Sequence, residues 1–206
     1  LIPVALVAGR HWRALLAASA VASALLVLSV VSFGIEVWSD YVRNLGVLRQ
    51  MILEDGSGVW HRFVSVFVAA RRLGAPVEAA YAIQAVAGAI ACLAVALIWL
   101  RDAPAGIKNA VLVLGTCLAT PYLQDYDLVF GALVVAWLWP CPSDPYTSDE
   151  PLQSSAALLL LLPLCAAALA HATGLAFGPL FIVPLFIVAV RMGFSARVAV
   201  CSRFKT

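Results

Sequence analysis

The feature that most constrains this chain is the run Ala14–Phe33, in which no side chain is more polar than serine. At about 1.5 Å per residue, a helix of this length spans the roughly 30 Å hydrocarbon core of a bilayer. Val77–Leu100 is a second such run, with Gln84 near its middle. Only 12% of the residues are charged, about half the share found in soluble domains. These runs predict an all-α integral membrane protein rather than a soluble domain.

Two further apolar runs predict helices near the end of the chain. They are Leu152–Ala172 and 176–190, joined by a short turn at Thr173 and Gly174. The opening run Leu1–Ala8 is too short to cross a bilayer, and we expect it to be the end of a helix that begins upstream. We therefore expect a single membrane domain over residues 1–206, a polytopic helix bundle that is truncated at its N-terminus.

The middle of the chain has a different pattern. Two short apolar runs, 107–119 and 128–139, flank the polar segment Thr120–Asp127. Each run reaches only about 18–20 Å as a helix, which is less than the hydrocarbon core. The runs either form a re-entrant pair or span with help from the polar segment. In both cases Thr120–Asp127 lies near the membrane, buried in protein or facing a water-filled cavity.

The stretch 34–76 predicts an outer loop of amphipathic helices. Apolar residues recur at helical spacing between Trp38 and Ile52, opposite a charged face. A second helix is expected at Val59–Leu73, with Phe63 and Phe67 on one face and His61, Ser65 and Arg72 on another.

Basic residues predict the orientation of the chain. Arginine and lysine are concentrated in three segments: Arg10–Arg13, Arg101–Lys108 and the tail after Arg191. Alternating the predicted spans places these segments on one side, which is cytoplasmic by the positive-inside rule. The loop 34–76 and the segment Thr120–Asp127 then lie on the outer side.

Asp125, Tyr126 and Asp127 are the first candidates for chemistry. Carboxylates at membrane depth are costly, and they indicate a functional site by default. The alternative is that Asp127 caps the helix that begins near Leu128 while Asp125 faces water. We keep both interpretations and assign these three residues to a catalytic site.

A second candidate site is cationic and aromatic. Trp60, His61, Arg62, Arg71 and Arg72 suit a phosphate or pyrophosphate group on the outer side. The alternative is interfacial anchoring by tryptophan and by arginines that extend to the headgroups.

The remaining histidines and cysteines suggest no such site. His171 is expected to be structural, and the scattered cysteines give no metal site. No cofactor is expected.

These motifs, in their order, resemble a known family. The chain has Trp60-His61-Arg62, then Arg72-Leu73-Gly74-Ala75-Pro76, then Thr120-Pro121-Tyr122 leading to Tyr126-Asp127-Leu128. Together with the opening Leu1-Ile2-Pro3, this order resembles the C-terminal part of glycosyltransferase family 87, over roughly Leu1–Trp139. The family consists of membrane mannosyltransferase-like proteins of the GT-C class.

The resemblance implies transfer of a hexose, mannose in particular, from a polyprenyl-phosphate donor to a lipid or glycan acceptor on the outer face. It implies a multi-pass protein of the bacterial inner membrane whose partners are the bilayer, the donor and the acceptor, with no nucleic acid. The usual catalytic base of the class lies in a first outer loop that we expect to be missing here, so the fragment alone should be inactive. Some relatives carry histidines near Tyr126 and Asp127, where this chain has none. Asp125 or Asp127 would assist the base, and His61, Arg62, Arg71 and Arg72 would hold the leaving phosphate.

Two other classes remain open from the residues alone. One is a transporter or flippase-like protein without chemistry, and the other is a structural membrane subunit. Transporters often show two matching halves with broken helices. One broken pair and no internal repeat weigh against transport.

Overall fold

The computed structural model describes residues 1–56, 58–138 and 165–195, and within them the chain is helical, with one isolated antiparallel β-bridge between Phe63 and Gln124. The α-helices are α1 (Ile2–Ala8), α2 (Trp12–Phe33), α3 (Ile35–Arg49), α4 (Val66–Arg72), α5 (Val77–Trp99), α6 (Ala105–Ala119), α7 (Gly131–Leu138) and α9 (Gly178–Ser195). Shorter turns are the π-helical η1 (Gln50–Glu54) and the 3₁₀ turns η2 (Trp60–Arg62) and η3 (Asp125–Phe130), and residues 165–173 are also helical. The prediction of an all-α membrane protein is confirmed.

Among the described residues, three helices are long and apolar enough to cross a membrane: α2, α5 and α9. The first two coincide closely with the predicted runs Ala14–Phe33 and Val77–Leu100, whereas α9 starts and ends later than the predicted 176–190. Most of the predicted span Leu152–Ala172 lies outside the described residues.

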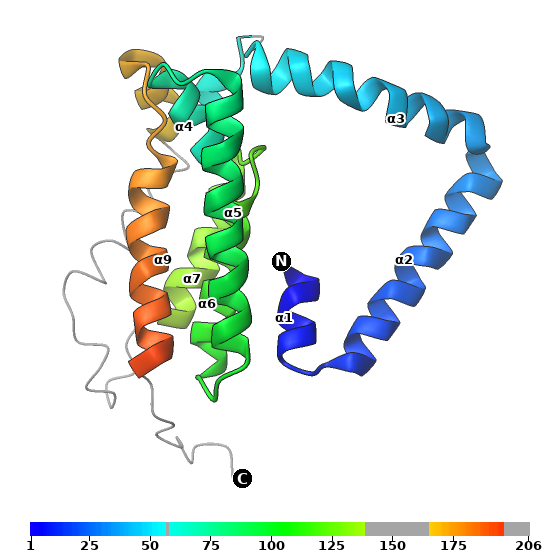
Figure 1. Ribbon diagram of the computed structural model, residues 1–206, viewed down its shortest axis with the longest axis vertical. Helices are drawn as coiled ribbons and strands as arrows, with labels where there is room; N and C mark the ends of the chain where they lie inside the picture. The colour runs from blue at the N-terminus through cyan, green and yellow to red at the C-terminus, as the bar shows by residue number, and fades with distance from the viewer. Residues whose placement is uncertain (57, 139–164, 196–206) are drawn as a thin grey trace.

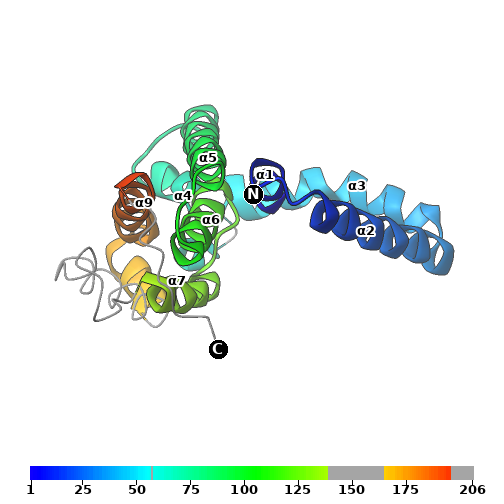
Figure 2. The ribbon, with the colours of Figure 1, turned by 90° about the horizontal axis from the view of Figure 1, so that it is seen from below.

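Helices α5, α6, α7 and α9 pack into one bundle (Figures 1 and 2). Small residues let the backbones approach, as expected of membrane helices. A Cβ at Gly88 of α5 would lie 3.7 Å from the Cα of Ala119, and one at Gly115 of α6 would lie 3.3 Å from the ring of Phe186 in α9. Fully buried Val95, Ile98 and Leu114 fill the space between the helices.

Helices α2 and α3 form an arm that extends away from the bundle (Figures 1 and 2). No residue of either helix is buried. Gly34, with φ of +83°, makes the sharp bend between them, which a residue with a side chain rarely adopts. The Nε1 of Trp38 donates to the Ser29 hydroxyl at 3.3 Å across this bend. The apolar surface of α2 is thus free to contact lipid.

The segment Thr120–Asp127 lies well within the length of α5. Helix α6 ends at Ala119, beside Gly88. Gly88 lies about 16 Å along α5 from Val77, at about 1.5 Å per residue. The polar segment that follows Ala119 is therefore packed against protein at a depth that α5 also occupies.

The basic turns gather at one end of the molecule. The α1–α2 turn, the α5–α6 turn and the C-terminal end of α9 lie at this end (Figure 1). Helices α3 and α4 and the start of α5 lie toward the other end. We call these the basic end and the opposite end.

The predicted continuous helix Val59–Leu73 is wrong. The turn η2 ends at Arg62, Phe63 and Ser65 are extended, and α4 begins at Val66. The break is stabilised by partners outside the segment, because the Val64 N–H donates to the Leu123 carbonyl at 3.0 Å. Ser65, predicted on a polar face, is 1% exposed, and its hydroxyl caps α4 by accepting from the Val68 N–H.

Candidate functional site

The β-bridge joins the two polar segments that the sequence singles out. Phe63 pairs with Gln124 in antiparallel register, and the Val64 N–H donates to the Leu123 carbonyl. In antiparallel pairing, the residue before one member faces the residue after the other. Arg62 is therefore placed opposite Asp125 by the register of the bridge.

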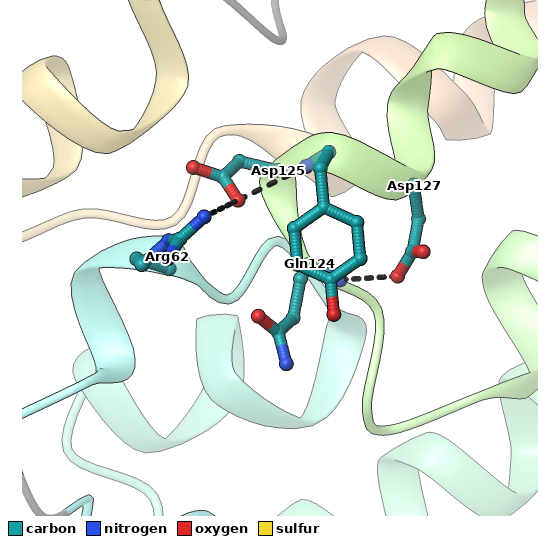
Figure 3. Close-up of polar contacts among 5 residues, drawn as sticks. Arg62, Gln124, Asp125 and Asp127 are labelled. Carbon is teal, nitrogen blue, oxygen red and sulfur yellow. Dashed lines mark hydrogen bonds and ion pairs between the residues drawn. The ribbon is translucent and has the colours of Figure 1, made fainter.

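Arg62 and Asp125 form an ion pair, which Figure 3 shows at close range. The Nη2 of Arg62 lies 3.3 Å from Oδ1 of Asp125. Asp125 is 8% exposed, whereas about half of the Arg62 side chain is accessible. The same Oδ1 accepts from the Tyr126 N–H at 2.9 Å, and the Arg62 guanidinium lies 5.7 Å from the centre of the Tyr126 ring. Arg62, from the predicted phosphate-binding residues, thus contacts Asp125 and Tyr126, which are two of the three predicted catalytic residues.

Asp127 acts as a cap. Its Oδ2 accepts from the Gln124 N–H at 2.9 Å (Figure 3), and the Asp127 N–H donates back to Gln124, whose backbone carbonyl lies 3.1 Å away. This reciprocal pair is a capping box, which satisfies two N–H groups at the start of η3. The structure therefore favours the capping interpretation for Asp127.

Gln84 links the two sides of the site from within α5. It is 5% exposed; its Oε1 accepts from the Phe67 N–H at 2.9 Å, and its Nε2 donates to the Leu118 carbonyl at 2.8 Å. These bonds fix the first turn of α4 and the last turn of α6, next to the two polar segments. The sequence shows Gln84 as a polar residue in a span but does not indicate its partners.

A pocket of about 340 Å³ lies at the opposite end. It is lined by Asp55, Gly56, Gly58, Trp60, His61, Arg72, Ala170, His171 and Gly174. The rings of His61 and His171 lie with their centres 5.7 Å apart and their planes tilted by 51°. The lining thus combines two imidazoles and a guanidinium, which are groups that can donate to a phosphate, with the Asp55 carboxylate.

We expected His171 to be structural, and in the structure its side chain lines the pocket. Nothing in the sequence near His171 indicates this site, because the contact with His61 joins residues that are far apart along the chain.

None of the segment Thr120–Asp127 is among the residues that line this pocket, and the segment contacts η2 through Arg62 instead. Consecutive residues of a 3₁₀ turn point about 120° apart. Consequently, within η2, His61 faces the pocket while the neighbouring Arg62 contacts Asp125. The candidate site has two adjacent parts, the junction of Arg62 with Asp125, which we call the acidic junction, and the pocket that contains His61, His171 and Arg72.

Arg71 and Arg72 bind backbone carbonyls. Arg71 donates to Ala75 at 2.8 Å and to Glu54 at 3.2 Å, and its guanidinium lies 5.5 Å from the centre of the Trp60 ring. Arg72 donates to the Ala170 carbonyl at 2.8 Å, and burial lowers the pKa of its guanidinium. Arg72 still lines the pocket, whereas Arg71 holds the turn before it.

Within residues 1–56, 58–138 and 165–195, no three histidine, cysteine or acidic side chains are grouped closely enough to hold a metal ion. What the described site presents is therefore an ion pair, a capped 3₁₀ turn and an imidazole-rich pocket.

Comparison with known proteins adds the family. The model of glycosyltransferase family 87 matches residues 1–121, more than half of the 206 residues. The matched range contains Trp60, His61, Arg62, Arg71 and Arg72, and it ends before the acidic segment. No curated protein and no solved structure matches the chain. The chain belongs to glycosyltransferase family 87, a family of membrane glycosyltransferases.

Proposed function

We propose that the full-length protein transfers a hexose, mannose in particular, from a polyprenyl-phosphate donor to a lipid or glycan acceptor at the outer face of the bacterial inner membrane. The proposed architecture is that of the GT-C class. The observation that carries the proposal is the pairing of Arg62 with Asp125 beside a pocket that contains His61 and His171. An anionic leaving group and an acceptor hydroxyl would each find suitable partners there.

The reaction makes one bond and breaks one. The acceptor hydroxyl oxygen attacks the anomeric carbon, and the bond from that carbon to the phosphate oxygen breaks. Polyprenyl phosphate leaves with the electron pair, and the hydroxyl proton passes to a base. Catalysis therefore requires a positioned proton acceptor and cationic or hydrogen-bonding groups at the phosphate.

In this proposal the pocket holds the donor phosphate. His61, His171 and Arg72 supply donors, and Trp60 covers the apolar side. Arg62 lies between the pocket and the acidic junction, where it can neutralise charge that develops on the leaving oxygen. Arg71 supports this arrangement through its contact with Trp60.

Asp125 is the acidic residue we assign to the acceptor side. Its Oδ1 takes the contacts with Arg62 and with the Tyr126 N–H, which leaves Oδ2 to face an incoming hydroxyl. Tyr126, half exposed, can stack on a sugar ring beside the Arg62 guanidinium. Asp127 holds the backbone of this turn as a cap. Asp125 would act together with the base expected in the upstream loop.

The proposal requires the pocket to face outward. Its sidedness is tested by single cysteines in a background without the native cysteines. We expect Glu36→Cys in α3 to react with a membrane-impermeant thiol reagent on intact cells, and Ala14→Cys at the α1–α2 turn to react only after the membrane is opened. The reverse pattern would place the pocket in the cytoplasm, away from an outer-face donor.

The activity is tested with purified full-length protein, radiolabelled polyprenyl-phosphate mannose and a membrane lipid extract as acceptor. We expect release of polyprenyl phosphate in equal amount to the mannosylated product. The Arg62→Gln and Arg72→Gln variants should raise the donor KM, since each charge-assisted contact contributes about 1.5–3 kcal/mol. Movement of intact donor across vesicle membranes without its cleavage would instead establish the flippase-like alternative.

A further inference from the structure

A second hollow lies at the basic end, remote from the pocket and the acidic junction. It has a volume of about 470 Å³ and is lined by Arg10, His11, Trp12, Arg13 and Ala14. These residues form the turn between α1 and α2 and the first turn of α2. The proposed glycosyl transfer makes no use of this hollow.

The cations of the hollow lack acidic partners among the described residues. The ion pairs in the described part of the chain involve Arg43, Arg49 and Arg62. Neither Arg10 nor Arg13 takes part in one. The first turn of α2 contains no acidic residue. Two accessible guanidinium groups therefore line the hollow without an ion pair to any carboxylate of the described residues, which favours an anionic ligand.

One wall of the hollow is fixed to the bundle. The ring of His11 packs edge-on against Trp99 of α5, with ring centres 6.1 Å apart. Gly9 leaves the room for this contact, because a Cβ there would lie 2.8 Å from the His11 ring and 3.0 Å from the Trp99 ring. The position of the turn relative to α5 is thus set by packing.

The surroundings of the hollow point to a lipid. Helix α2 is long and apolar enough to span the membrane, and none of its residues is buried. Leu16, one turn from the hollow, is 69% exposed, and Trp12 is 53% exposed. Tryptophan is enriched at the membrane interface, where basic side chains beside a span attract anionic headgroups. A lipid bound here would place its phosphate between the arginines and its acyl chains along α2.

We propose that this hollow binds the phosphate headgroup of an anionic phospholipid in the leaflet at the basic end. Arg10 and Arg13 bind the phosphate, Trp12 contacts the glycerol and upper acyl region, and His11 anchors the turn. The site is independent of the glycosyl transfer, so either proposal can fail without the other.

The test uses full-length protein in vesicles that contain brominated phosphatidylglycerol or brominated phosphatidylcholine, each at the same fraction of total lipid. Bromine quenches tryptophan fluorescence at short range, and subtraction of a Trp12→Phe variant isolates the signal of Trp12. We expect half-maximal quenching of Trp12 at a severalfold lower fraction of brominated phosphatidylglycerol than of brominated phosphatidylcholine. About fivefold per arginine is the expected scale, since each arginine contributes about 1 kcal/mol near an anionic surface.

The key variant is Arg10→Asn with Arg13→Gln. Asparagine suits position 10 because the backbone there has φ of +57°. Its matched control is Arg101→Gln with Arg191→Gln, which removes the same charge from the same end outside the hollow. We expect the preference to disappear in the first protein and to persist in the second. The single Arg13→Gln variant leaves the turn unchanged and should lose a large part of the preference, which keeps the test valid if the double variant does not fold.

Three results would overturn the proposal. Equal loss in both double variants would indicate diffuse attraction by the whole basic end. No preference in the unmodified protein would remove the site. Displacement of the anionic lipid by millimolar inorganic phosphate at constant ionic strength would show a site for free phosphate rather than for a lipid.

Discussion

The arm and the bundle each contain an ion pair between an arginine and an aspartate, and the two pairs have similar lengths. Arg43 and Asp40 lie 3.1 Å apart within α3, whereas Arg62 and Asp125 lie 3.3 Å apart and join segments from different parts of the chain. The side chain of Asp40 is 63% exposed, whereas that of Asp125 is 11% exposed. The first pair follows from helical spacing, and the second exists only because the chain is folded.

The difference shows how little a short distance says about the role of a pair. Exposed pairs on one helix contribute little, because water screens both charges and each side chain must be ordered. Breaking a partly buried pair that joins two segments costs more free energy, since the carboxylate would be left unpaired in an apolar setting. The comparison predicts that equivalent substitutions in the arm and in the bundle have very different effects.

The largest expected effect is on turnover. Asp125→Asn keeps the shape of the side chain but removes its charge, so that Arg62 loses its counterion at the acidic junction. If Asp125 is a positioned acid–base group, turnover of the full-length enzyme should fall by a factor of about 10²–10⁴. Initial rates and the yield of folded protein on size exclusion measure this directly. The control Asp40→Asn should retain turnover within about twofold, and a similar loss in both variants would contradict the comparison.

The next effect is on stability. Gln84→Leu leaves the buried Phe67 N–H and Leu118 carbonyl without the partner they have now. Each unsatisfied group costs about 1–3 kcal/mol, so unfolding in detergent should require clearly less denaturant. Gln50→Leu, at the exposed first residue of η1 directly after the arm, is the matched control and should change the free energy of unfolding by less than about 0.5 kcal/mol. A stable Gln84→Leu protein would show that the two segments do not depend on this bridge.

Two glycines should respond in opposite directions. A Cβ at Gly178 would overlap the Val64 carbonyl oxygen and lie 2.6 Å from the Val64 Cβ, so Gly178→Ala should cost about 1–3 kcal/mol. Gly46 of α3 has nothing within 4 Å, so Gly46→Ala should stabilise its helix by up to about 1 kcal/mol. Thermal unfolding of both variants tests the contrast, and the same sign of change in both would refute it.

The smallest effect concerns the arm pair itself. A double-mutant cycle with Arg43→Gln and Asp40→Asn should give a coupling energy of only about 0.2–0.5 kcal/mol, measured by denaturant unfolding. The equivalent cycle with Arg62→Gln and Asp125→Asn should give a larger value. A greater coupling at Arg43 and Asp40 would reverse the ranking of the two regions.

The long helices could be predicted from the sequence because their signal is local. The limits of α2 and α5 agree with the predicted runs to within a few residues, since apolar side chains and helix length are sufficient to define a span. The short apolar run before Thr120 likewise matches α6. The second short run begins as the 3₁₀ turn η3 before it becomes α7, a detail that apolar content does not specify.

The site was only partly predictable, because its geometry depends on tertiary partners. The sequence indicated Arg62 and Asp125 as members of two separate candidate sites. Their pairing depends on the register of a β-bridge between two short segments, which the sequence does not show. Helical periodicity failed at Ser65, where a cap and an extended backbone interrupt the expected helix. The roles of Arg71 and of His171 could not be inferred, because backbone carbonyls and a ring contact from distant segments determine them.

The bridge between Phe63 and Gln124 also determines which changes of chain length the molecule can accept. One residue inserted between Phe63 and Val66 would change the spacing between the bridge and the start of α4. Unless the extra residue bulged out, either the register that pairs Arg62 with Asp125 or the cap at Ser65 would be lost, because pairing shifted by one position turns side chains to the other face. Gly56 and Gly58, which both have positive φ, lie before the bridge, so extra length beside them would not change that register. Among homologues, length variation should therefore be found beside these glycines and be absent from the residues between the bridge and α4.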